Sequence, residues 1–92
     1  MTERITNAHL EGKVRMINKL LGNDPDAPYS TPGVVVLSGA YGGTGVHRYV
    51  NTSGAVSDLM GGHFTKREVA WFLDGMREAL FIAFIANEEA EQ

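Results

Sequence analysis

A run of glycines between two β-like segments is the feature that most restricts how this chain can fold. Four glycines stand within residues 39–45, between the β-branched segment 33–38 and the alternating segment 46–50. Only glycine enters backbone conformations with positive φ without steric cost, so the backbone is expected to turn within this run. The connections between the expected strands are too short for crossovers, which favours antiparallel pairing. The glycine run therefore predicts a hairpin, although its composition also suits a catalytic loop.

Helical periodicity marks the N-terminal part of the chain. Residues 7–21 predict a first helix, in which Asn7 caps the first turn and Gly22 ends the last. Its apolar face recurs at helical spacing and comprises Leu10, Val14, Ile17 and Leu21. The following segment, 23–32, holds all three prolines and is expected to be a rigid, extended connector to the sheet. A disordered linker is the alternative, which a chain with room for only one domain disfavours.

The remaining elements complete a single α+β domain over residues 1–92. The alternating segment 46–50 is expected to have two faces, one with Val46, Arg48 and Val50 and one with His47 and Tyr49. A turn at 51–54 leads to a third expected strand at 55–60. Thr65 and Glu68 have the spacing of a capping box, which predicts a last helix from residue 66 to about 88. The predicted order is an N-terminal helix, a three-stranded antiparallel meander and a long C-terminal helix (α-β-β-β-α), with the acidic tail 88–92 as a solvated helix end or a frayed terminus.

The expected last helix is apolar around most of its circumference. Its first apolar stripe is assigned to the sheet and the first helix, and comprises Val69, Phe72, Leu73, Met76, Leu80, Ala83 and Phe84. A second stripe lies roughly opposite and comprises Trp71, Phe81, Ile82 and Ile85. One small sheet cannot cover both sides, and four large apolar side chains left in water would favour aggregation. We therefore expect a homodimer or a higher homo-oligomer that buries the second stripe; the alternative is that the first helix wraps onto it.

Charge and composition exclude several classes of function. Eleven acidic and eight basic side chains give a formal net charge of −3, which predicts no general attraction to nucleic-acid phosphates. The chain has no cysteine, so a disulfide framework, a thiolate metal site and a thiol nucleophile are excluded. The most apolar run, 79–86, is far shorter than the roughly 20 residues of a membrane-spanning helix, and no secretory signal is visible. A cytoplasmic protein without a membrane partner is expected.

Several short motifs resemble those of one group of viral proteins. The motifs are Leu20-Leu21-Gly22, the segment 37–43 with Gly39-Ala40-Tyr41-Gly42-Gly43 as its sharpest part, Gly54-Ala55-Val56-Ser57-Asp58, and Thr65-Lys66-Arg67-Glu68. Over about residues 10–80 the chain thus resembles small uncharacterised proteins encoded by phages of Gram-positive bacteria, especially actinobacteria. The resemblance implies a phage accessory protein acting in the cytoplasm of a bacterial host. It implies no catalytic residue, and it does not extend to residues 81–86.

The residue pattern gives little support to a ligand site. The glycine run lacks the Gly-Lys-Ser/Thr ending of a phosphate loop and leads into a strand instead of a helix. Three histidines, His9, His47 and His63, match no metal-ligand spacing. His47 and His63 can still meet in space, since the second strand and the start of the last helix can be neighbours. No cofactor and no metal are expected.

A catalytic hypothesis would combine Ser57, Asp58 and either His47 or His63 in one site. A nucleophile needs a base within hydrogen-bond reach, and nothing in this spacing enforces such contact. No Gly-x-Ser-x-Gly elbow is present either. Asp58 is expected instead to cap a turn or to pair with Arg48 across the strands. The chain is therefore predicted to be no enzyme.

Two binding functions remain. The first is a self-associating protein-interaction module for a host or phage protein, whose candidate partner surface comprises Tyr41, Thr44, Arg48 and Tyr49. The alternative is a nucleic-acid-binding domain, because the predicted element order is that of double-stranded-RNA-binding domains. Its candidate contacts are His63, Lys66 and Arg67. The overall negative charge and the adjacent Glu68 make the alternative the weaker hypothesis.

Overall fold

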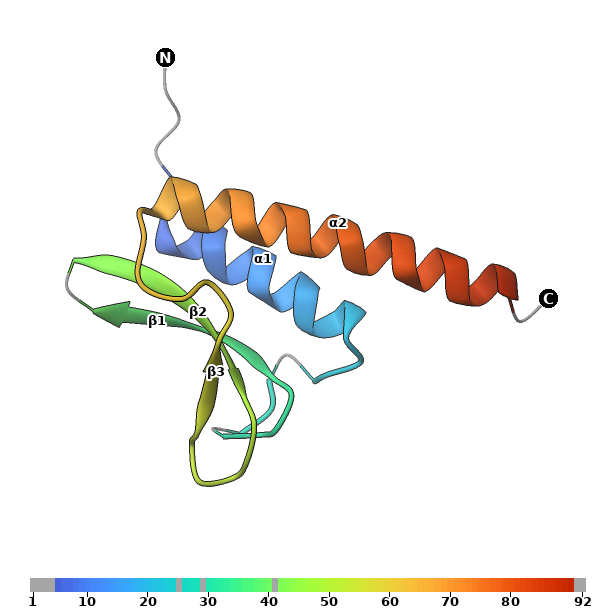
Figure 1. Cartoon of the computed structure of the whole chain (residues 1–92), viewed down its shortest axis with the longest axis horizontal. Coiled ribbons are helices and arrows are strands. Elements are labelled where there is room, and N and C mark those ends of the chain that lie inside the picture. Colours follow the sequence, from blue (N-terminus) through green and yellow to red (C-terminus); the bar gives the residue numbers. More distant parts are fainter. Residues whose placement is uncertain (1–4, 25, 29, 41, 91–92) are drawn as a thin grey trace, which may run out of the picture.

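The computed structural model describes residues 5–24, 26–28, 30–40 and 42–90. Its elements follow the predicted α-β-β-β-α order of an α+β protein (Figure 1). They are α1 (Asn7–Leu20), β1 (Val35–Ala40), β2 (Gly43–Tyr49), β3 (Val56–Asp58) and α2 (Lys66–Ala90).

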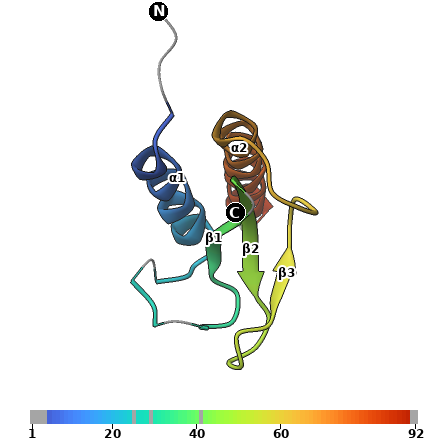
Figure 2. The same cartoon turned by 90° about the vertical axis from the view of Figure 1, so that its left-hand side faces the viewer.

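The strands form one antiparallel sheet in the order β1-β2-β3. Both helices lie side by side on one face of this sheet (Figure 2), with α1 packed on β1 and α2 on β2. The buried core lies between these layers and consists of Leu10, Val14 and Ile17 from α1, Val35 and Val46 from the sheet, and Val69, Ala70 and Leu73 from α2. No described helix covers the other face of the sheet.

The start of α1 differs from the prediction. Thr6, and not Asn7, is the N-cap: its Oγ1 accepts a hydrogen bond from the backbone N–H of His9 at 3.3 Å, while the Thr6 N–H donates to His9 Nδ1 at 3.3 Å. This reciprocal pair satisfies two amides that would otherwise lack partners at the helix start. The predicted capping box of α2 is confirmed, since the Thr65 Oγ1 accepts from the Glu68 N–H and the Glu68 carboxylate accepts from the Thr65 N–H, each at 3.2 Å.

The strand boundaries are shifted from those predicted. Gly33 and Val34 precede β1 instead of opening it, because Gly33 has a φ of +90° and the Val34 N–H donates to the Thr31 carbonyl in a turn. The first strand then continues to Ala40, two residues further than expected. The third strand ends at Asp58, whose carboxylate accepts hydrogen bonds from the N–H groups of Met60 and Gly61 and turns the chain.

The glycine run forms the predicted hairpin, but two of its glycines serve another purpose. Ala40 pairs with Gly43, and the turn between them includes Gly42 at a φ of +73°. The two glycines are Gly43 and Gly45 in β2, because the segment 62–64 passes close to both of them. A Cβ on Gly45 would lie 2.8 Å from the Gly62 carbonyl oxygen. Thr44 and Phe64 exchange two backbone hydrogen bonds of 2.8 Å at this crossing. Bare backbone in β2 therefore allows the connection to α2 to lie against the sheet.

Candidate interaction surfaces

The register of the sheet confirms the two predicted faces of β2. Residues directly opposite in antiparallel strands share a face, so Arg48 lies with Val35 and Ser57, and His47 lies with Val36 and Asp58. Val46 is fully buried beneath the helices, which identifies the face shared by Val46 and Arg48 as the covered one. His47 and Tyr49 stand on the open face.

The open face brings His47, His63 and Asp58 together. The rings of His47 and His63 meet edge to face with centroids 6.2 Å apart, so the predicted encounter of these two histidines is confirmed. His47 Nε2 lies 3.9 Å from a carboxylate oxygen of Asp58. Within the described ranges, no group of three or more His, Cys, Asp or Glu side chains is arranged to hold a metal ion.

Asp58 caps a turn, which confirms one of its two predicted roles. The other prediction, that Asp58 pairs with Arg48 across the strands, is wrong. The register places it opposite His47, while Arg48 donates from Nε to the Gly33 carbonyl at 2.9 Å. Partial burial acts to raise the pKa of Asp58, but hydrogen bonds from the backbone N–H groups of Gly61, Met60 and Gly62 outweigh it and lower this pKa. Ser57 faces the opposite side of the sheet from His47 and Asp58, so the strand alternation separates the members of the candidate triad.

The candidate partner surface does not form one patch. Thr44, Arg48 and Tyr49 belong to β2 and not to a loop, and Arg48 and Tyr49 point to opposite faces. Tyr41 lies outside the described residues. His9, in the first turn of α1, is far along the chain from the other histidines and hydrogen-bonds its own helix cap.

The basic residues of the alternative function lie at the start of α2. Lys66 and Arg67 are exposed, and Lys66 lines a hollow with Gly42, Gly43 and Thr44 of the β1–β2 hairpin. Glu68 follows directly, and its carboxylate is held in the capping box. The positive surface thus consists of only Lys66 and Arg67, and the Glu68 carboxylate, hydrogen-bonded to Thr65, lies next to them in sequence.

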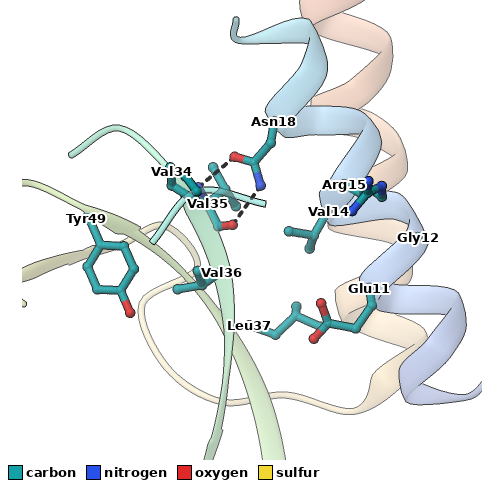
Figure 3. Close-up of a pocket in the computed structure, with 11 residues that line it drawn as sticks. Glu11, Gly12, Val14, Arg15, Asn18, Val34, Val35, Val36, Leu37 and Tyr49 are labelled. Atoms are coloured by element: carbon teal, nitrogen blue, oxygen red, sulfur yellow. Dashed lines mark hydrogen bonds between the residues drawn. The ribbon is translucent and has the colours of Figure 1, made fainter. Parts of the chain in front are cut away.

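A groove of about 540 Å³ separates α1 from the free edge of β1 (Figure 3). Asn18 closes one end of the groove by bridging to the backbone of Val35, and Glu11 and Leu37 lie across from each other further along. Alternate residues of an edge strand direct their N–H and C=O groups outward. Asn18 forms hydrogen bonds with the outward N–H and C=O of Val35. Among the described residues, no partner is seen for the outward backbone groups of Leu37 and Gly39. This edge can chemically accept one or two residues of extended backbone.

The largest exposed apolar surface lies on α2. The four side chains assigned to the second stripe are exposed, from 38% for Ile85 to 65% for Trp71. The first helix does not wrap onto them. Trp71 remains 65% exposed although it borders α1 across a shallow hollow. The C-terminal part of α2, which has 25 residues against 14, extends beyond the end of α1 at Leu20 (Figure 1). The first stripe is covered only as far as Leu80. Ala83 and Phe84 are exposed, which corrects their assignment to the sheet and the first helix.

Comparisons with known proteins identify no relative of this chain. No protein-family model, no curated protein and no solved structure matches the chain. Within the described part of the chain, no helix is both long and apolar enough to cross a membrane.

Proposed function

We propose that this protein is a non-enzymatic interaction module that self-associates through α2, as an accessory protein of a bacteriophage in the cytoplasm of its host. One observation carries the self-association: five large apolar side chains are exposed along a single helix, namely Trp71, Phe81, Ile82, Phe84 and Ile85. The phage origin is supported by the motif resemblance alone. A host or phage protein is the proposed further partner.

The exposed apolar area favours an identical partner. Fully burying a side chain of this size is worth about 1.5–3 kcal/mol, and a two-fold contact would bury Trp71, Ile82 and Ile85 in both copies. The gain must exceed a cost of roughly 4–15 kcal/mol for lost translational and rotational freedom. Side chains contributed by both copies can together meet this cost, whereas a single one cannot.

The competing proposal is nucleic-acid binding through His63, Lys66 and Arg67. Its support is the exposure of the two cations beside the β1–β2 hairpin. The net charge of −3 opposes it. Binding to double-stranded RNA that falls steeply with salt, and that is lost when Lys66→Ala is combined with Arg67→Ala, would favour this alternative.

Light scattering after size-exclusion chromatography tests self-association. The wild-type mass is expected to be at least twice the 10.0 kDa of one chain, and Ile82→Asp is expected to lower it. Val50→Asp is the matched control, because Val50 has a similar exposure of 57% but directly follows β2 and is not part of α2. A wild-type protein that stays monomeric at all accessible concentrations contradicts the proposal.

A further inference from the structure

The charges of α2 are placed against its own dipole. A helix carries a partial positive charge at its N-terminus and a partial negative charge at its C-terminus, so acidic residues suit its start and basic residues its end. In α2, Lys66 and Arg67 stand in the first turn, Glu88 and Glu89 stand near the end, and the last turn has no basic residue. The only acidic residue of the first turn, Glu68, is engaged in the capping box. Glu68 offsets the basic start in part, whereas no basic residue of the last turn offsets the acidic end.

From this inversion we infer that two copies of α2 pair in antiparallel orientation about a two-fold axis at Glu78. The inference rests on the proposed self-association and specifies its geometry. An antiparallel partner brings its acidic end to the basic end of the first helix, and its dipole runs the opposite way. A parallel partner would instead set Arg67 against Arg67 and Glu89 against Glu89.

The sequence of α2 offers one continuous seam for this contact. Positions spaced by three or four residues lie along one side of a helix, and here they are Arg67, Trp71, Gly75, Glu78, Ile82, Ile85 and Glu89. All seven are exposed in the single chain. The first helix lies beside the seam, since Lys13 and Asp74 form an ion pair of 2.6 Å, and Trp71 borders α1 across a shallow hollow.

The two ends of the seam are complementary when it is reversed about Glu78. Arg67 then faces Glu89 of the second copy, and Trp71 faces Ile85 of the second copy. Gly75 lies one turn before the axis, where a Cβ would meet nothing within 4 Å, so the two helices can approach closely there. Reversal also brings Ile82 level with Asp74 of the second copy, whose charge Lys13 of its own chain offsets at 2.6 Å. The contact between the two copies of Glu78 on the axis is unfavourable. Glu78→Gln is therefore expected to tighten the dimer, by roughly threefold to tenfold for one relieved like-charge contact.

Single cysteines test the orientation cleanly, because the native chain contains none. Glu78→Cys is expected to form a disulfide-linked dimer rapidly under mild oxidation. Arg67→Cys and Glu89→Cys are each expected to resist cross-linking alone and to cross-link when the two variants are mixed. Ser53→Cys, in an exposed turn remote from α2, is the control that should remain uncross-linked.

The outcomes separate the geometry from self-association itself. Rapid cross-linking of Arg67→Cys with itself would show a parallel pair, which overturns the inference while the proposed function stands. A dimer by light scattering in which Glu78→Cys fails to cross-link also overturns it. A monomer throughout overturns both proposals.

Charge reversal gives an independent measure. Arg67→Glu is expected to weaken the dimer by about tenfold or more, since each dimer contains two such contacts. Combining it with Glu89→Arg is expected to restore the affinity to near that of the wild type. A double variant no tighter than Arg67→Glu alone would contradict the antiparallel contact, whether or not the protein remains dimeric.

Discussion

Asn18 holds the edge of the sheet by pairing with both backbone groups of Val35. Its Nδ2 donates to the Val35 carbonyl at 2.9 Å, and its Oδ1 accepts from the Val35 N–H at 2.8 Å. The amide thus imitates a neighbouring strand from within a helix. Both residues are almost fully buried, so these hydrogen bonds fix α1 against β1 where the strand would otherwise leave two buried polar groups without partners.

Asn18→Ala is therefore expected to destabilise the protein more than the replacement of an exposed polar side chain would. Losing two buried hydrogen bonds and leaving the Val35 groups unsatisfied should cost about 2–3 kcal/mol of unfolding free energy. Urea denaturation followed by circular dichroism measures this loss. Asn7→Ala, the same change at an exposed position of α1, is the control, and equal effects of the two variants would refute the bridging role.

Two glycine-to-alanine changes are expected to have opposite signs. Gly45→Ala sets a Cβ 2.8 Å from the Gly62 carbonyl oxygen, which should cost about 1–3 kcal/mol through overpacking. Gly12→Ala adds a Cβ in the exposed interior of α1 with nothing within 4 Å, and should gain about 1 kcal/mol from helix propensity. Thermal unfolding of both variants checks the contrast; a neutral Gly45→Ala would mean that the crossing at 62–64 is looser than described.

The corrected N-cap of α1 makes a third prediction. Thr6→Ala is expected to lower the unfolding free energy by about 1 kcal/mol, because it removes the acceptor of the His9 N–H. Asn7→Ala should change it by only a few tenths, since Asn7 already lies inside the helix. The reverse order of effects in chemical denaturation would restore Asn7 as the cap.

Asp58 gives a dependence of stability on pH. Its pKa in the folded chain is below its ordinary value of 3.8, so its contribution is present at pH values above 3.8 and is lost as the pH falls through the lower folded pKa. Asp58→Asn should therefore be less stable than the wild type at neutral pH, and the difference should shrink in acid. Unfolding curves at neutral and strongly acidic pH measure this, and a difference independent of pH would argue against the carboxylate as the cause.

Local patterns were sufficient to predict the order of elements. The Thr65–Glu68 spacing, the β-branched run and the glycine turn each act within a few residues of sequence, and each is confirmed. The errors arose where distant segments decide the outcome. The close crossing of 62–64 over Gly43 and Gly45 requires contacts that no local pattern encodes, and the same holds for the bridge from Asn18 to Val35.

The candidate surfaces were predictable to a different extent. Alternation along β2 gave the two faces, and helical spacing gave the exposed residues of α2. The end of α1 relative to α2 could not be deduced, and for that reason Phe84 was assigned to the core. The inverted charges of α2 are present in the sequence. Comparing the charged residues at the two ends of each predicted helix with the helix dipole would have revealed them.

The buried contacts of α2 stop at Leu73, and its half-buried ones stop at Leu80. The ten residues that follow are all exposed. Beyond Phe81, which lines a hollow with Met16 and Leu20 of α1, they form an arm without buried residues. Short helical stretches without tertiary support are marginal in water. The helix content of this protein is consequently expected to rise with its concentration, because pairing with a second copy would stabilise the last three turns.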